Sequence, residues 1–171
     1  MRNIIICLLL LAAIKGAGQT PEEKLSGLGI QLPKIPPPIA SYVHVVKTGN
    51  LLFLAGKGPQ KQDGEYIKGK PGTTLTLEQG YEAAKLTGII QLAVLKDVLG
   101  SLSKVKRIVK VNGYVNSDGN FYDHPKVING FSDLMIAVFG EKGKHARTSL
   151  GVAALPMNMA VEIEMVVEVE E

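Results

Sequence analysis

Residues 147–169, RTSLGVAALPMNMAVEIEMVVEV, carry the strongest structural pattern in the chain. Apolar and acidic side chains alternate from Val161 to Val169, and a period of two is typical of a strand with one buried and one exposed face. The segment Leu155–Asn158 contains a proline and separates this strand from the mostly apolar residues 147–154. We therefore predict two strands here, over residues 147–154 and 159–169.

Two more strands are expected upstream as a hairpin. Residues 42–47 and 51–55 are rich in β-branched and aromatic side chains, and Thr48-Gly49-Asn50 between them is a short turn signal. Residues 56–75, which contain five glycines and two prolines, are expected to form a long loop.

Helical signals follow this loop. Thr76 and Gln79 have the spacing of a capping box, and the apolar residues behind them recur at helical steps until Gly100. Residues 105–115 have strand character, and Asp123 with Pro125 is expected to begin a second helix. The resulting order, β-β-α-β-α-β-β, predicts an α+β fold in which two helices pack on one face of a mixed sheet.

The N-terminal 38 residues differ in composition from the rest. Residues 1–20 combine Arg2, an apolar run over 4–14 and small residues at 16–18, which is the layout of a cleaved signal peptide. The alternative is an uncleaved N-terminal anchor. Residues 21–38 are expected to be an extended, proline-rich arm, and residues 39–171 the folded domain. A secreted or periplasmic protein without a membrane segment is therefore expected after cleavage.

Removal of this leader would change the charge and the thiol content of the chain. Loss of Arg2 and Lys15 leaves 17 basic against 16 acidic side chains, a net charge of +1. A chain with so little positive charge is not expected to bind nucleic acid. The single cysteine, Cys7, would also leave, which excludes a cysteine nucleophile, a disulfide or a cysteine metal site.

Two charged residues stand out as candidates for chemistry. Arg147 begins an otherwise apolar strand, and its guanidinium is suited to grip a carboxylate through two parallel hydrogen bonds. Glu162 is the first acidic residue of the last strand and is a candidate general base. The alternative is that both are ordinary surface charges on strands. His44, His124 and His145 lack a metal-ligand spacing, so we expect no metal site and no cofactor.

The sequence also resembles the YjgF/Rid family, in collinear order from about residue 36 to residue 168. The segments that carry the resemblance are PIASYV at 38–43, TGNLLFLAG at 48–56, VINGF at 127–131, RTSLGVAALP at 147–156 and VEIE at 161–164. The segment 77–113 looks like a less-characterised branch and not like the enamine/imine deaminase branch.

This resemblance implies a chorismate-mutase-like homotrimer with pockets between its subunits. It implies that Arg147 grips the carboxylate of a 2-imino acid and that Glu162 activates the attacking water. It also implies that Tyr42, Gly56, Asn129 and Ser149 lie at substrate-binding positions. The deaminase branch has Ser where this chain has Ala55, and Cys where it has Ser149.

The expected activity is hydrolytic deamination of small 2-imino or enamine acids to 2-keto acids and ammonia, of the 2-iminobutanoate/2-iminopropanoate deaminase type. The alternative is a trimeric module that binds small carboxylates without turnover, which the changes at Ala55 and Ser149 favour. A ribonuclease function, attached to some relatives, is disfavoured by the low charge and the scarcity of aromatic residues.

Overall fold

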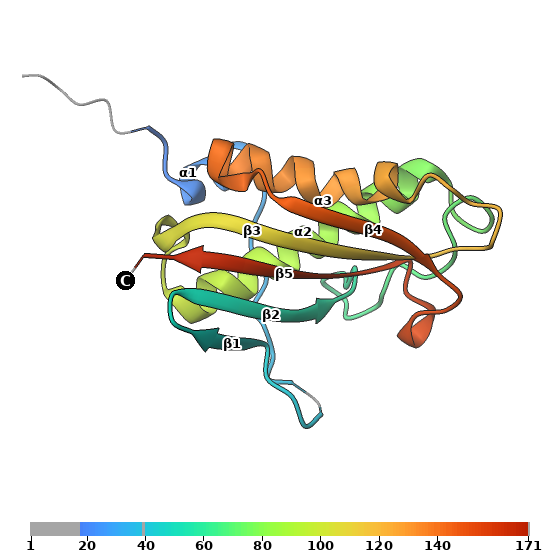
Figure 1. Cartoon of the computed structure of the whole chain (residues 1–171), viewed down its shortest axis with the longest axis horizontal. Coiled ribbons are helices and arrows are strands. Elements are labelled where there is room, and N and C mark those ends of the chain that lie inside the picture. The colour runs from blue at the N-terminus through green and yellow to red at the C-terminus, as the bar shows by residue number, and fades with distance from the viewer. Residues whose placement is uncertain (1–17, 39, 171) are drawn as a thin grey trace, which may run out of the picture.

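The computed structural model describes residues 18–38 and 40–170, so most of the leader predicted at 1–20 lies outside the described residues. The elements follow one another in the order shown in Figure 1. The strands are β1 (Val45–Thr48), β2 (Leu51–Lys57), β3 (Val105–Asn116), β4 (Ala146–Val152) and β5 (Val161–Val169). The helices are α1 (Pro21–Gly27), α2 (Leu77–Leu99) and α3 (His124–Phe139), with short 3-10 turns at Leu102–Lys104, Gly140–Gly143 and Pro156–Asn158.

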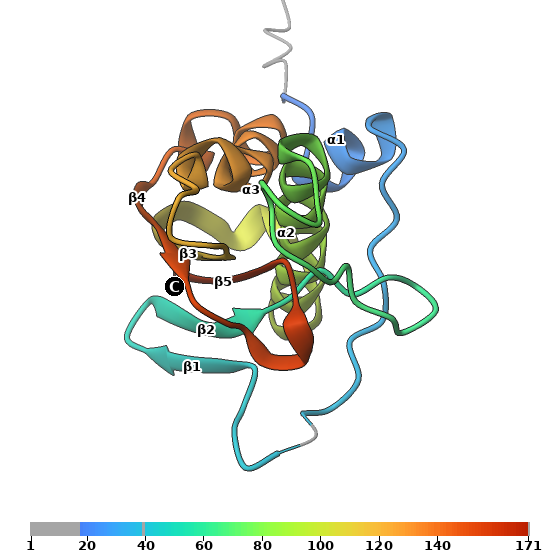
Figure 2. The same ribbon diagram turned by 90° about the vertical axis from the view of Figure 1, so that its right-hand side faces the viewer.

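The five strands form one mixed sheet in the order β1-β2-β5-β3-β4. Strands β3 and β4 are parallel because α3 crosses between them, and the other neighbours are antiparallel. Helices α2 and α3 pack together on one face of the sheet (Figures 1 and 2). The predicted α+β architecture is confirmed.

The core lies between these helices and the sheet. The alternation predicted for the last strand is confirmed, since the odd-numbered residues from Val161 to Val169 are buried and the even-numbered ones are partly exposed. On the helix side, α3 contributes the apolar stripe of Ile128, Phe131 and Met135, each fully buried. This packing holds β5 and α3 rigidly, and both carry candidate site residues.

Local signals explain where the elements begin and end. The capping box between Thr76 and Gln79 forms at the start of α2, and Gly100 ends that helix with a φ of 73°. The β1–β2 hairpin pairs Thr48 with Leu51, and its turn uses Gly49 at a φ of 56°. At both points the backbone has a positive φ angle, a left-handed conformation that glycine adopts without steric strain.

Three predictions need correction. Residues 21–27 are helical rather than extended, because Thr20 and Glu23 form a second capping box, Pro21 occupies the first turn and Leu25 is buried. The side chain of Asp123 does not cap α3 but pairs with Lys126 at 3.1 Å. Strands β1 and β2 cover 45–48 and 51–57, so the first begins later and the second ends later than expected.

The sheet face opposite the helices carries exposed apolar side chains. Val46, Phe53 and Leu150 lie on this face, with 56%, 44% and 52% of their surface exposed. No described helix covers the face (Figure 2). Within residues 18–38 and 40–170, no helix combines the length and the apolar character needed to cross a membrane.

Candidate functional site

Arg147 lies on the edge strand β4 with its guanidinium directed toward α3. One terminal nitrogen, Nη1, donates to Asn129 Oδ1 at 2.8 Å and to Ser132 Oγ at 3.0 Å. The other, Nη2, donates to the carbonyl oxygen of Pro125 at 3.4 Å. These neutral acceptors orient the guanidinium without cancelling its charge, and some of its donors remain for a ligand.

A second layer of hydrogen bonds holds this arrangement. Ser132 Oγ lies 3.0 Å from His145 Nε2, and His145 Nδ1 lies 2.7 Å from the carbonyl oxygen of Gly143. Because that carbonyl only accepts, Nδ1 carries the proton and Nε2 accepts from the Ser132 hydroxyl. Burial lowers the pKa of His145, and the charge of Arg147 lowers it further. His145 is therefore part of the support for Arg147.

Glu162 lies on the opposite face of the sheet, in a cleft of about 730 Å³. The cleft lies at the end of β2, and its lining includes Tyr42, Gly56, Lys57 and Tyr66. A Cβ atom at Gly56 would overlap the Glu162 carboxylate, so a side chain at this position would force that carboxylate to shift.

The position of Gly56 results from an irregularity in the sheet. The register between β2 and β5 shifts between Leu54 and Lys57. The fully buried Gln91 of α2 donates from Nε2 to the carbonyl oxygens of Ala55, at 3.0 Å, and Ile163, at 2.8 Å. An amide side chain thus supplies hydrogen bonds at the bulge, which fixes the backbone beside Glu162.

The environment of Glu162 favours its protonated form. Burial raises the pKa of Glu162, and the nearby charge of Glu164 raises it further. Glu164 itself accepts hydrogen bonds from Asn112 Nδ2 at 2.9 Å and from the Tyr114 hydroxyl at 3.4 Å. A carboxyl group whose pKa is raised toward neutrality is suited to take up and return a proton.

Within one chain, Arg147 and Glu162 do not meet. Arg147 pairs in register with Val111 of β3, which is fully buried on the helix side. Glu162 pairs with Tyr114 of β3, and its side chain points to the other face because it lies between two buried residues. The chain therefore holds two separate clusters of polar side chains, around Arg147 and around Glu162, which we call the arginine half-site and the glutamate half-site.

The other predicted residues divide between the two half-sites. Tyr42 and Gly56 lie with Glu162, and Asn129 bonds to Arg147. Ser149 lies two residues from Arg147 on β4, and its buried hydroxyl has no hydrogen-bond partner among the described residues.

Sequence reasoning missed Lys57 and His44, which line the cleft that contains Glu162. Lys57 Nζ lies 2.7 Å from His44 Nδ1 and 5.8 Å from the centre of the Tyr42 ring. Burial lowers the pKa of Lys57. The sequence feature that could have indicated Lys57 is its position between two glycines at the end of an apolar strand.

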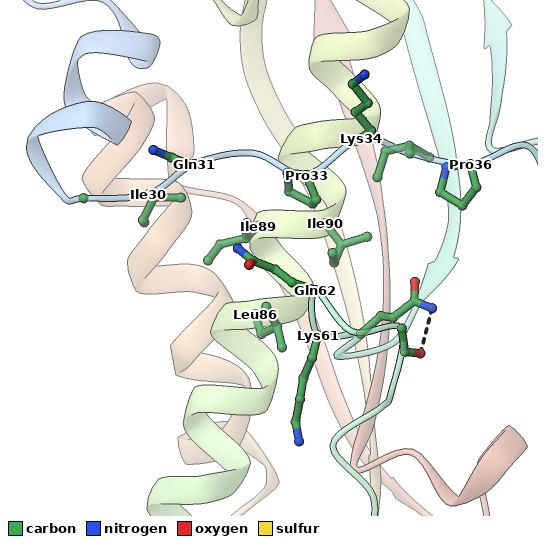
Figure 3. A pocket seen from close by; sticks show the side chains of 14 residues that line it. Ile30, Gln31, Pro33, Lys34, Pro36, Lys61, Gln62, Leu86, Ile89 and Ile90 are labelled. Carbon is green, nitrogen blue, oxygen red and sulfur yellow. Dashed lines mark hydrogen bonds between the residues drawn. The ribbon is translucent and has the colours of Figure 1, made fainter.

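A second cavity, of about 440 Å³, lies between the N-terminal arm and α2 (Figure 3). Ile30 and Pro33 of the arm face Leu86, Ile89 and Ile90 of the helix across it. Its lining is largely apolar and contains no acidic residue or histidine. Nowhere in the described part of the chain do three or more His, Cys, Asp or Glu side chains gather as a metal site would require.

The mixed sheet, the two covering helices and the two half-sites define a chorismate-mutase-like protein. The model of the family described as "YjgF/chorismate mutase-like, putative endoribonuclease" matches residues 22–169. The chain therefore belongs to the YjgF/Rid family, as the sequence motifs indicated.

Individual relatives agree with this assignment. Protein TCP17 of Trypanosoma cruzi is 41% identical over 145 residues, covering 84% of this chain and 91% of that one. A 2-iminobutanoate/2-iminopropanoate deaminase of Dermatophagoides farinae is 30% identical over 142 residues, covering 82% and 95%. The crystal structure of the protein Atu1372, of unknown function, from Agrobacterium tumefaciens has 38% identity and a TM-score of 0.82 over 88% of this chain and 94% of that chain.

Proposed function

We propose that the chain is a hydrolytic deaminase of small 2-imino acids, active as a homotrimer. In this proposal Arg147 of one protomer faces Glu162 of its neighbour across the subunit interface. The observation that carries the proposal is the separation of the arginine and glutamate half-sites on opposite faces of one sheet, since each lacks what the other supplies.

The exposed sheet face supports self-association. Val46, Phe53 and Leu150 form apolar surface on a face that the described helices leave open. Exposed apolar side chains on an uncovered sheet face support the proposal that this face is an interface. A second copy of the chain would cover it and bring a β4 edge toward the glutamate half-site.

The proposed chemistry needs only positioning and one proton carrier. Arg147 binds the carboxylate of the protonated imine and holds its electrophilic carbon near Glu162. Ionised Glu162 takes a proton from water as the oxygen attacks, giving a carbinolamine, and returns it to the nitrogen. As the C–N bond breaks, the carbinolamine hydroxyl gives its proton, through Glu162, to the departing ammonia, so that R–C(=NH2+)–COO− and water become R–CO–COO− and NH4+.

The test is ammonia release from freshly generated iminopropanoate. We expect Arg147→Ala and Glu162→Gln each to lower kcat/KM by at least about 100-fold, since each removes a group used in the transition state. Matched controls are Arg107→Ala and Glu141→Gln, because both side chains are exposed. Background rates in the unmodified protein, or equal rates in Arg147→Ala, would contradict the proposal.

A second candidate function is carboxylate binding without turnover. Ala55 lacks a hydroxyl beside Gly56, and the Ser149 hydroxyl is buried without a described partner. A binding protein would show a thermal shift with pyruvate that disappears in Arg147→Lys, while iminopropanoate decays at its uncatalysed rate.

Export through the N-terminal leader is part of the proposal. The charged, apolar and small-residue order of positions 1–20 supports cleavage and a secreted or periplasmic location. N-terminal sequencing of the protein from its native source tests this, and a retained residue 1 would contradict it.

A further inference from the structure

We propose that Lys57 makes the glutamate half-site selective for ligands with a second negative group. The substrate class is then a dicarboxylic 2-imino acid, whose distal carboxylate binds the Lys57 ammonium. This inference rests on the proposed function, because the first carboxylate is assigned to Arg147.

Lys57 is a half-buried cation in the cleft that Glu162 and Glu164 also line. It forms no ion pair with any described residue, whereas Lys70 and Lys96 pair with carboxylates at 2.8 and 2.7 Å. The lowering of the pKa of Lys57 comes from burial alone, with no contribution from a neighbouring acid. A partly desolvated charge is costly unless it is paired, so the cleft favours an anion at this position.

His44 orients this lysine without neutralising it. His44 Nε2 lies 2.8 Å from the carbonyl oxygen of Pro36, which only accepts, so Nε2 carries a proton. In neutral His44, Nδ1 therefore accepts one hydrogen bond from Lys57 Nζ at 2.7 Å. The ammonium keeps its charge and its other two protons for a ligand.

The position of Lys57 in the cleft is also suited to the second carboxylate of a dicarboxylic substrate. Lys57 and Glu162 line the same cleft but form no ion pair with each other. The cleft has about 730 Å³, whereas a three-carbon imino acid occupies only the volume of a few waters, on the order of 100 Å³. There is room beyond the reacting carbon for a longer chain that ends in a carboxylate.

The test uses two stable keto acids of equal chain length, 2-oxoglutarate and 2-oxopentanoate, which differ in the distal carboxylate. Calorimetric titration of the full trimer should show 2-oxoglutarate binding about tenfold or more tightly, the effect of one charge-assisted hydrogen bond. Lys57→Met should abolish this preference while changing the Kd of 2-oxopentanoate by less than about twofold. Lys61→Met, an exposed lysine of the following loop, is the matched control.

The outcomes separate this inference from the function on which it rests. Equal binding of both acids by the unmodified protein, or a preference that survives in Lys57→Met, overturns the role of Lys57 and leaves the deaminase proposal intact. Binding of neither acid overturns both. If Lys57→Met does not fold, two other variants decide: Lys57→Arg keeps the charge and must retain the preference, whereas Lys57→Gln must lose it. The opposite result in either folded variant overturns the role of Lys57.

Discussion

The arginine half-site and the glutamate half-site differ in how their surroundings treat the charged form of the central side chain. Arg147 is held by neutral acceptors from α3, so its charge is oriented but not compensated. Glu162 is half-buried near another carboxylate, so its ionised form is disfavoured. In the proposed function, the first half-site binds an anion and the second exchanges a proton. Binding and proton transfer would then be divided between the two faces of the sheet.

Among substitutions that leave Arg147 and Glu162 in place, the largest effect is expected from Gly56→Ala, which disturbs the glutamate half-site. The new Cβ atom would overlap the Glu162 carboxylate and displace it. A displacement of about 1 Å costs on the order of 100-fold in rate, so kcat for iminopropanoate should fall by about that factor. Gly27→Ala is the control, because its Cβ meets no atom within 4 Å. A kcat close to that of the unmodified protein would show that Glu162 needs no such space.

Gln91→Leu should weaken the scaffold of the same half-site. The substitution removes two hydrogen bonds, to Ala55 and Ile163, from a fully buried position. We expect the free energy of unfolding to fall by about 1–3 kcal/mol, measured by urea denaturation. The exposed Gln62→Leu serves as the control. Unchanged stability would mean that the bulge at residues 55 and 56 does not depend on α2.

Glu164→Gln tests the electrostatic difference between the half-sites. Loss of the Glu164 charge removes one cause of the raised pKa of Glu162, so that pKa should fall. Glu162 acts as a base when ionised. In a plot of kcat for iminopropanoate against pH, the fall in rate on the acidic side should therefore move to lower pH. Glu141→Gln, far more exposed, should leave this fall in place. A fall that moves to higher pH would contradict the assignment.

The smallest effect is expected in the arginine half-site from Ser132→Ala. Ser132 accepts only one of the three hydrogen bonds from Arg147, and Asn129 and Pro125 retain the others. We expect KM to rise about threefold to tenfold with little change in kcat, as for one weakened hydrogen bond. Ser103→Ala, at an exposed position, provides the comparison. A selective loss of kcat would instead place Ser132 near the reacting atoms.

The sequence predicted the features that depend on neighbouring residues. The turn at Gly49, the capping box of α2 and the alternation in β5 can each be recognised within a few residues. Arg147 was recognisable as a charge at the start of an otherwise apolar strand and Glu162 as the first acidic residue of the last strand, and the family motifs favoured these two over other charges. The helix at 21–27 was missed although its capping box was present, because the proline-rich context favoured an extended arm.

The missed features depend on contacts between distant residues. The bulge beside Gly56 arises from the pairing of β2 with β5, and Gln91 that supports it comes from α2. The contact of Lys57 with His44 requires the β1–β2 hairpin, and His44 is fixed in turn by Pro36. No local pattern reports such contacts, so the two half-sites became visible only when the sheet register was known.

The most direct test of a site built from two protomers is complementation between inactive variants. Arg147→Ala and Glu162→Gln chains, mixed in equal amounts and reassembled, would place an intact Arg147 opposite an intact Glu162 in about one quarter of the interfaces. The account predicts that iminopropanoate deamination recovers to about one quarter of the unmodified rate. A mixture that forms mixed trimers but stays as inactive as its components would contradict the account.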